Sequence, residues 1–305
     1  MIRFGVLGAA RITPAALIYP CMNEPLAHIS VIAARDRDRA KAYAAAHHIG
    51  TVCDSYLDVV DHEKINALYN PLHIPAHHPW TMAALKAGKH VLCEKSLACN
   101  ANQAREMNQL AKDKGLVLMD AFHYRYHPLF ARMKNIVDSE ELGTISSIDA
   151  AFHIPVTDPG DIRMNYDLGG GVTMDIGCYP ISWVRHLAGT EPTVVSATAE
   201  VGPPQVDLLM ETKMEAGNIA ITTSADMRAS ASFKAELTVR GSKGEMQVDN
   251  PIAPHMGHLL TLNVGGRTSH ETVDRRPTYA YQLDAFIAAV EKNEPLWTDG
   301  NDAVA

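Results

Sequence analysis

An acid and a lysine stand together at the point where a buried strand should end. The apolar segment Val91-Leu92-Cys93 is followed directly by Glu94 and Lys95. An amine in this position can donate a hydrogen bond to a substrate hydroxyl and ease its deprotonation, or it can polarise a carbonyl oxygen during reduction. The alternative is a solvated lysine that begins a loop, which is the commoner fate of lysine side chains. The place at a strand end favours chemistry.

A second candidate site lies near the N-terminus, where an apolar strand runs into a turn of small residues. Gly8, Ala10 and Thr13 take the three places of the dinucleotide fingerprint G-x-G-x-x-G. Only the first is a glycine, so a turn that serves packing alone also fits. Because a strand precedes the turn and a helix follows it, we expect the backbone N–H groups of Ala10, Arg11 and Ile12 to face phosphate groups.

The next apolar strand ends in Ala34-Arg35-Asp36. A carboxylate at this position would accept hydrogen bonds from the adenosine ribose of NAD, whereas a guanidinium suits the 2′-phosphate of NADP. Arg35 therefore favours NADP as cofactor, with NAD still possible because Asp36 could take the ribose. A solvated arginine at a strand end is the alternative.

A histidine-containing loop follows the third expected strand, with the sequence Asn70-Pro71-Leu72-His73-Ile74-Pro75-Ala76-His77-His78. The two prolines stiffen a segment that would run beside the nicotinamide. Three histidines within six residues invite a metal hypothesis, but no carboxylate or cysteine accompanies them. We predict cofactor contact or helix capping by Leu72, His73 and His78, and no metal site.

The second half of the chain contains a glycine run, Gly169-Gly170-Gly171, that leads into a predicted helix. Asp175 and Tyr179 are spaced i, i+4 on this helix, so both should project from one face. An acid and a phenol arranged in this way could bind a polyol and pass a proton. A buried tyrosine bonded to a structural aspartate is an equally good interpretation of the spacing.

The elements that must position these residues alternate between strand and helix over residues 1–121. Short, almost wholly apolar strands separated by helices indicate a parallel sheet covered on both faces, whose ligands bind at the carboxyl ends of the strands. The expected strands are 2–7, 29–34, 67–69, 90–93 and 116–119, and the expected helices are 14–22, 37–47, 57–61, 76–87 and 101–114.

Residues 122–305 have a different pattern, in which polar and apolar side chains alternate between close turns. We therefore predict an α/β protein, with a doubly wound Rossmann domain over 1–121 and an α+β domain with a large open, mainly antiparallel sheet over 122–305. The expected strands are 144–154, 193–202, 205–214, 217–225, 232–240, 244–248 and 259–264, and the expected helices are 128–139, 171–188 and 279–292.

Length and composition limit the function classes. A chain of 305 residues exceeds one usual core, and 35 acidic against 27 basic side chains argue against a nucleic-acid binder. No apolar run approaches the length that spans a bilayer, and no secretory leader is expected before the first strand. Five cysteines without CxxC spacing suit free thiols in a reducing compartment. We expect a cytoplasmic protein that binds neither nucleic acid nor membrane.

In this order the motifs resemble the Gfo/Idh/MocA oxidoreductases. The resemblance rests on Gly5-Val6-Leu7-Gly8-Ala9-Ala10-Arg11-Ile12, on Glu94-Lys95, and on the glycine run followed by Asp175-x-Gly177-x-Tyr179. Within the family, Ala33-Ala34-Arg35-Asp36 and Phe122-His123-Tyr124-Arg125-Tyr126-His127-Pro128 are nearest to the dimeric dihydrodiol dehydrogenase and D-xylose dehydrogenase branch. One departure is Ser96, because the family usually has proline after the lysine.

The resemblance implies a role for each motif residue. Lys95 would be the active-site lysine, and Tyr179 would hold the general acid/base position, which is histidine in the inositol dehydrogenase relatives. Asp175 would contact the substrate or orient the pair. The other implied site residues are Glu94 and Lys95 at the cofactor, Tyr124 and Arg125 at the substrate, and Arg163 at either. The open sheet often forms the dimer face in this family, so we expect a homodimer or a higher homo-oligomer.

The sequence thus predicts an NADP-dependent dehydrogenase that transfers hydride between the nicotinamide and a hydroxyl of a sugar, polyol or vicinal diol. Tyr179, assisted by Lys95, would accept the hydroxyl proton. Two alternatives remain. A nucleotide-retaining lyase or hydrolase would oxidise a glycosidic substrate transiently and show no net cofactor reduction. A non-catalytic NAD(P)-binding sensor would have no need of the lysine, aspartate and tyrosine together.

Overall fold

The computed structural model describes residues 1–202 and 205–305, which divide into two compact units. Unit 1 comprises Met1–Arg125 and Tyr279–Ala305, and unit 2 comprises Tyr126–Thr278. Residues 279–305, which were predicted to belong to the second domain, group with the first unit in the structure. Each unit is described by itself below.

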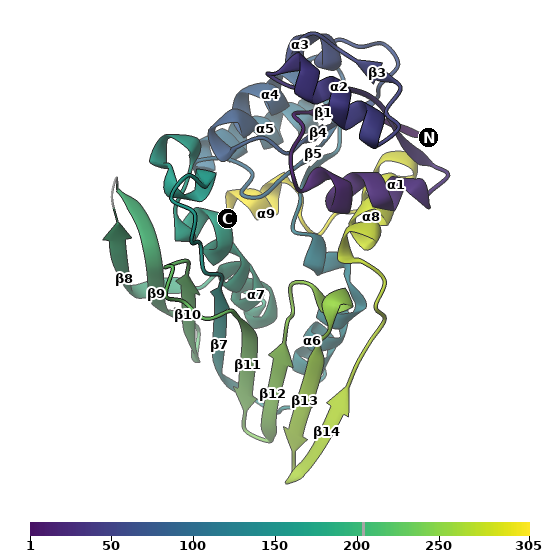
Figure 1. Ribbon diagram of the computed structural model, residues 1–305. Helices are drawn as coiled ribbons and strands as arrows, with labels where there is room; N and C mark the ends of the chain where they lie inside the picture. Colours follow the sequence, from purple (N-terminus) through teal and green to yellow (C-terminus); the bar gives the residue numbers. More distant parts are fainter. Residues whose placement is uncertain (203–204) are drawn as a thin grey trace. The chain divides into compact units, whose positions relative to one another are not determined.

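Unit 1 is built on a parallel sheet of six strands, as predicted for a Rossmann domain (Figure 1). Every pair of neighbouring strands is parallel, so all the strand ends that precede a helix meet at one edge. In spatial order the strands are β3 (Thr51–Val52), β2 (Ala27–Ala33), β1 (Ile2–Leu7), β4 (Ala67–Asn70), β5 (His90–Cys93) and β6 (Leu118–Asp120).

The strands of this sheet are apolar because helices cover both of its faces. On one face Leu7, Leu68 and Val91 are buried in a core with residues of α3, α4 and α5. Successive side chains of a strand point to opposite faces; on the other face, Phe4 lies with its ring centroid 5.5 Å from that of Phe286 in α8. The helices of the unit are η1 (Pro14–Ile18, π-helical), α1 (Tyr19–Met22), α2 (Arg37–Ala46), α3 (Tyr56–Val60), α4 (Ile74–Lys86), α5 (Ala101–Lys114), α8 (Thr278–Lys292) and α9 (Gly300–Val304).

The C-terminal segment joins unit 1 by pairing with the last strand of the sheet. The backbone N–H of Asp120 donates to the carbonyl of Thr298 at 2.9 Å, and Met119 forms an antiparallel bridge with Asp299. Helix α9 then packs on α5 and on β6. Contacts between residues so distant in sequence explain why residues 279–305 group with the first unit.

Unit 2 is an eight-stranded sheet in which only β7 and β10 run parallel to each other (Figure 1). This is the predicted open, mainly antiparallel sheet. The edge strand β14 is an addition to the expected strands, because its exposed residues have no apolar pattern. In spatial order the strands are β14 (Arg267–Glu271), β13 (Leu259–Val264), β12 (Gly244–Asp249), β11 (Lys234–Gly241), β7 (Ile145–His153), β10 (Ile219–Asp226), β9 (Val206–Ala216) and β8 (Thr193–Gly202).

Burial alternates along the inner strands, because helices cover only one face of this sheet. In β11, for example, Ala235, Leu237 and Val239 are buried and Glu236 between them is exposed. Helix α7 packs on β7 and β10, with α6 beside it. The helical segments of unit 2 are α6 (Pro128–Asp138), η3 (Ile162–Met164), η4 (Tyr166–Leu168), the π-helical turn η5 (Thr173–Gly177), α7 (Cys178–Ala188) and η6 (Pro254–Met256). The short segment η2 (His123–Tyr126) begins in unit 1 and ends at the first residue of unit 2.

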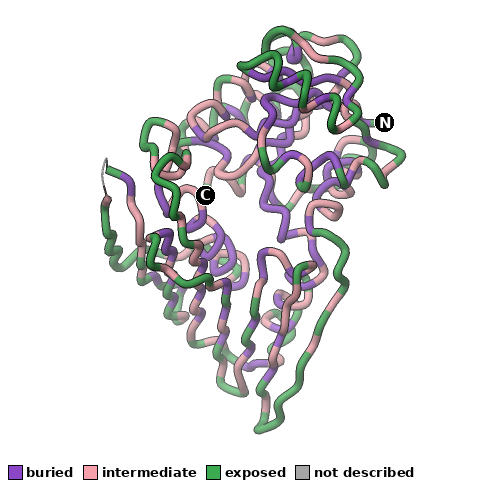
Figure 2. The backbone as a smooth tube through the Cα atoms, in the orientation of Figure 1, coloured by how far each residue is buried: buried purple, intermediate pink, exposed green. Residues whose placement is uncertain are grey.

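The edge strand β8 is exposed along nearly its whole length, as the green trace in Figure 2 shows. Its apolar side chains are no exception, since Val194, Val195 and Val201 are 60%, 59% and 61% exposed. Single exposed apolar residues are ordinary, but a strand whose valines are open to solvent is typical of an interaction surface.

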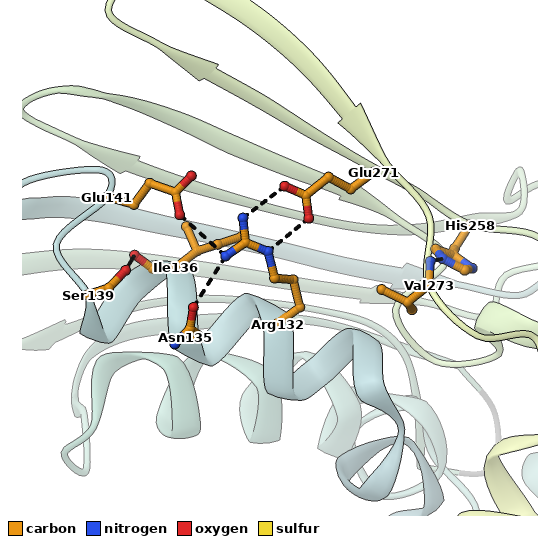
Figure 3. A network of polar contacts seen from close by, with 8 residues as sticks. All are labelled: Arg132, Asn135, Ile136, Ser139, Glu141, His258, Glu271 and Val273. Atoms are coloured by element: carbon orange, nitrogen blue, oxygen red, sulfur yellow. Dashed lines mark hydrogen bonds and ion pairs between the residues drawn. The ribbon is translucent and has the colours of Figure 1, made fainter.

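A charged network joins α6 to the opposite edge of the sheet (Figure 3). The Arg132 guanidinium donates two hydrogen bonds of 2.8 Å to the carboxylate of Glu271 in β14, and its remaining nitrogen donates to Glu141 and Asn135 at 3.3 Å. Two parallel N–H···O bonds make this pair stronger than an ordinary surface ion pair.

We expect Arg132→Ala to lower the free energy of unfolding by about 1–2 kcal/mol, because a two-pronged charged contact is lost and Glu271 is left without it. Lys134→Ala is the matched control, since it removes an exposed ion pair with Asp138 on the same helix and should cost at most about 0.5 kcal/mol. Urea unfolding of the two variants measures the difference. Equal losses would contradict a special role for the Arg132 pair.

The same pair makes stability depend on pH. Hydrogen bonds from Arg132 hold the pKa of Glu271 below its ordinary value. The stabilisation is therefore present above the unfolded pKa of about 4.3 and is lost as pH falls through the lower folded pKa. The gap in unfolding free energy between wild type and Arg132→Ala should shrink in that acidic range.

Candidate active site

The glycine turn after β1 has the geometry that the fingerprint predicts. Gly8 has φ +84°, a backbone conformation that side chains disfavour, and a Cβ added there would lie 3.1 Å from Leu72 Cδ2. The carbonyls of the turn are engaged by α2: Ala9 accepts from Arg39 at 2.7 Å and Ala10 from the Tyr43 hydroxyl at 3.1 Å. The turn is thus braced from the side of α2.

The residues of this turn fit a dinucleotide. A cradle that a Cβ would fill lies at Gly8, and the first helix begins directly afterwards with the π-helical turn η1. π-helical turns occur often at functional sites, and the start of a helix favours phosphate groups. The sequence gives no sign of the π-turn, because its residues are those of an ordinary helix start.

Arg35 follows β2 at the same edge of the sheet and is exposed. Burial raises the pKa of the Tyr56 hydroxyl, and the charges of Arg35 and Arg39 oppose that rise. Burial also lowers the pKa of His73, and Arg35 lowers it further. Arg35 therefore lies near both rings, in a cationic corner that would accommodate a phosphate group. Asp36 caps α2 by accepting from two backbone N–H groups, of Asp38 at 2.9 Å and of Arg39 at 3.0 Å.

The loop after β4 brings Leu72 beside Gly8 and places His73 at the N-cap of α4. His78, in the first turns of this helix, forms a contact of 2.8 Å with Glu106 on α5. His78 thus has a partner within the protein, and its contact with the cofactor stays a prediction. His77 is fully buried, with each ring nitrogen 2.8 Å from a backbone carbonyl oxygen, of Ser96 and of Leu72.

Glu94 and Lys95 are both partly buried where β5 ends. The Tyr69 hydroxyl donates to Glu94 Oε1 at 2.6 Å. Burial raises the pKa of Glu94, and it raises the pKa of Asp120 at the end of β6 well above its usual range. The charge of Lys95 lowers the pKa of both carboxyl groups. Lys95 is therefore held near two acids, and the peptide bond that joins it to Ser96 is cis.

Tyr124 and Arg125 lie in η2, after β6. Tyr124 is fully buried, and only 9% of Arg125 is exposed. The guanidinium of Arg125 stands 5.7 Å from the centre of the Trp297 ring, within the range of a cation–π contact. Both side chains lie largely in the interior of the protein. Their contact with a substrate stays a prediction.

In unit 2 the glycine run holds Arg163 against Asp175. The backbone N–H of Gly171 donates to the Arg163 carbonyl at 3.0 Å, and a Cβ on Gly170 would lie only 2.5 Å from that oxygen. Arg163 Nε donates to Asp175 Oδ2 at 2.5 Å and Nη1 to the Asp161 carboxylate at 3.2 Å. Although burial opposes it, these two acids raise the pKa of Arg163. The glycines are required because the two chain segments touch.

Tyr179 lies on α7, just after the π-helical turn that contains Asp175. Only 5% of Tyr179 is exposed. Its ring meets Phe152 edge-on, with centroids 5.6 Å apart, and lies 6.5 Å from Trp183. The phenol is thus fixed by packing between β7 and α7, which suits a group that must hold one orientation.

The structure brings most of the predicted residues of each unit together. In unit 1 the turn at Gly8, the loop at Leu72 and the strand ends at Arg35 and Lys95 share one sheet edge; in unit 2 Arg163 binds Asp175. Sequence reasoning gave no role to Tyr69, His77 or Asp120. Only position could have suggested them, since Tyr69 and Asp120 lie at strand ends and His77 follows the loop by one helical turn.

The described residues include neither a cluster suited to a metal ion nor a helix suited to span a membrane. Within residues 1–202 and 205–305, no group of three His, Cys, Asp or Glu side chains is arranged to hold a metal ion. In the same part of the chain, no helix is both long and apolar enough to cross a membrane.

Comparison with known proteins gives the class. The model of the oxidoreductase family, NAD-binding Rossmann fold, matches residues 2–122, and that of the GFO/IDH/MocA C-terminal domain matches residues 130–247. The chain therefore belongs to the Gfo/Idh/MocA oxidoreductases, as the motifs predicted.

Individual relatives cover almost the whole chain. D-xylose 1-dehydrogenase (NADP(+)) 2 of Haloferax volcanii is 34% identical, over 99% of this chain and 93% of its own. A dTDP-3,4-didehydro-2,6-dideoxy-alpha-D-glucose 3-reductase of Streptomyces antibioticus is 31% identical, over 95% and 89%. The 3-ketoreductase KijD10 of Actinomadura kijaniata, solved with NADP and TDP-benzene, superimposes with a TM-score of 0.93 at 28% identity, over 99% and 94%.

We expect Gly8→Ala to weaken nicotinamide nucleotide binding on the order of tenfold, because the new Cβ presses on Leu72 and narrows the cradle. Gly88→Ala is the matched control: Gly88 also has positive φ, +75°, but a Cβ there meets nothing within 4 Å. Both variants should lose about 1–2 kcal/mol of stability through the backbone. Fluorescence titration with NADPH measures binding, and equal affinities of the two variants would contradict the role of Gly8.

Proposed function

We propose that this protein is an NADP-dependent oxidoreductase that transfers hydride between the nicotinamide and a hydroxyl of a sugar, polyol or vicinal diol. The observation that carries the proposal is the continuous set of contacts at one edge of the unit 1 sheet. A Cβ on Gly8 would touch Leu72, and the His77 imidazole lies between the Leu72 carbonyl and the Ser96 carbonyl, each 2.8 Å from one of its nitrogens. The amine is thereby tied to the turn that fits a dinucleotide.

NADP is the cofactor that the corner of Arg35 favours. The exposed guanidinium, near Tyr56 and His73, suits a 2′-phosphate, while Asp36 is occupied in capping α2. Two relatives support the same choice. The Haloferax volcanii dehydrogenase is named for NADP(+), and KijD10 was solved with NADP. The phosphates would be held by the turn residues Gly8, Ala10, Arg11 and Ile12. The nicotinamide ring would lie beside Leu72, His73 and Glu94.

Different residues of the chain would then transfer the proton and stabilise the developing charge. When bound, the nicotinamide supplies the acceptor or donor of hydride. In the oxidative direction, Tyr179 Oη would take the hydroxyl proton while the Lys95 amine stabilises the negative charge that develops on the substrate oxygen. Arg163, which donates to Asp175 Oδ2, would hold that carboxylate oriented towards the substrate. Structures of KijD10 include variants at one lysine and at one tyrosine, the residue types proposed here.

A sugar or related polyol is the substrate class that the relatives support, because their names are those of a xylose dehydrogenase and of deoxysugar reductases. We propose that unit 2 supplies Asp175 and Arg163 to that substrate, with Tyr124 and Arg125 near it. The alternatives of a lyase, hydrolase or sensor gain nothing from relatives named as dehydrogenases and reductases.

We further propose a homodimer or higher homo-oligomer that uses the uncovered face of the unit 2 sheet. The exposed valines of β8 and the uncovered outer face of the sheet support this assignment. A cytoplasmic location is supported by the five cysteines, which form no disulfide within the described part of the chain.

We expect Lys95→Ala to reduce turnover by roughly 10²–10⁴-fold, because the group that stabilises charge on the substrate oxygen is removed. The assay is nicotinamide reduction with NADP and with NAD against a panel of aldoses, inositols and trans-diols. Lys86→Ala, which removes an exposed lysine of α4, is the control and should retain wild-type rates. A folded Lys95→Ala variant within a few-fold of wild type would overturn the assignment of the lysine. A wild-type protein that binds NADP but reduces none of it would overturn the dehydrogenase proposal.

We expect Arg35→Ala to weaken NADP binding by roughly 10- to 100-fold and NAD binding far less, because only NADP carries the phosphate that the guanidinium would bind. Arg37→Ala removes the same charge two residues further on, where the side chain pairs with Asp54 at 2.8 Å. Dissociation constants for both nucleotides give the comparison. Equal losses for NADP and NAD would rule out the phosphate role.

A further inference from the structure

His77 is a buried polar residue between two loops of unit 1 that the proposed reaction uses. Its side chain has no exposed surface. Nδ1 lies 2.8 Å from the carbonyl oxygen of Ser96, which follows Lys95, and Nε2 lies 2.8 Å from the carbonyl oxygen of Leu72. The imidazole therefore spans the distance between the lysine loop and the loop beside Gly8.

The backbone of His77 is held by the end of β4. Asn70 is fully buried, and its Nδ2 donates to the His77 carbonyl and to Thr81 Oγ1, each at 3.3 Å. The Asn70 carbonyl accepts from the backbone N–H of Glu94 at 3.0 Å. The strand end, the helix and the lysine loop thus form one hydrogen-bonded group, in which His77 reaches past Glu94 to Ser96.

The charge state of the ring limits what it can donate. Burial lowers the pKa of His77 to about 4, although the two carbonyl contacts oppose that change. A neutral imidazole has one N–H, so it can donate to either carbonyl but not to both at once. A side chain with a single amide group could supply one such donor, and an apolar side chain could supply none.

We propose that His77 is a positioning residue for Lys95, because its buried imidazole packs between the backbone beside the lysine and the loop that borders the dinucleotide turn and donates to one of their two carbonyls. The inference rests on the proposed function, since it gives Lys95 the task that requires fixed placement. His77 itself need touch neither substrate nor cofactor. A displacement of about 1 Å at a catalytic group is enough to cost roughly 100-fold in rate.

The first test needs no activity. Hydrogen–deuterium exchange, read by mass spectrometry, is compared for wild type, His77→Gln and His77→Leu. We expect faster exchange confined to the peptides that cover residues 71–73 and 94–97, with the larger effect in His77→Leu. His90→Gln is the matched control, because His90 is a partly buried histidine at the opposite end of β5, where Nδ1 accepts from Val117 N at 3.0 Å. Unchanged exchange in both peptides would overturn the proposal.

The second test separates positioning from general stability. Turnover with NADP and the best substrate of the panel is measured for His77→Leu, Lys95→Ala and the double variant. We expect His77→Leu to lose about 10- to 100-fold in kcat in the wild-type background and almost nothing in the Lys95→Ala background. His77→Gln should recover part of the loss. The same factor of loss in both backgrounds would overturn the link to Lys95, whereas a wild-type protein that binds NADP but reduces none of it would overturn the proposed function itself.

Discussion

The site in unit 1 depends on the field of one lysine among buried acids. Glu94, which is partly buried, and Asp120, which is buried, lie at the ends of neighbouring strands. Burial raises the pKa of both carboxyl groups, and the charges of Asp302 and Glu94 raise that of Asp120 further. Lys95 opposes both effects. Because a lysine is also costly to bury unpaired, the acids and the amine stabilise one another's charge, and this coupling holds the amine at the sheet edge.

Unit 2 uses the same principle with the signs exchanged. There the central group is the Arg163 guanidinium, which lies between the carboxylates of Asp175 and Asp161. Arg163 can reach Asp175 because the loop that carries the arginine packs directly against the glycine run, where a Cβ on Gly170 would collide with the Arg163 carbonyl. In each unit a positively charged side chain is therefore paired with carboxyl groups that are already in place around it. Charges held in fixed positions in this way are what catalysis by electrostatic preorganisation requires.

The sequence predicted those parts of the structure that depend on local pattern. The apolar runs gave β1, β2, β4 and β5, and the alternation gave most of the unit 2 sheet. Strand β14 was not predicted, because an exposed edge strand has no apolar pattern. Residues 279–305 were assigned to the second domain, because their pairing with β6 is a long-range contact that a local pattern does not indicate. The π-turns before Tyr19 and Cys178 have no residue signature that separates them from α-helix.

The candidate site shows the same division between local and long-range information. Lys95, Asp175 and Tyr179 stand in recognisable motifs, whereas the importance of His77 depends on what lies across from it in space. This bears on Ser96, where the family usually has proline. A proline ring restricts the backbone from within the residue. In this chain the Ser96 carbonyl lies against the imidazole of His77, a residue of α4 whose backbone carbonyl is held by Asn70. The placement of the lysine therefore depends on packing in the helix behind it, and a change at that helix would act on the site without touching it.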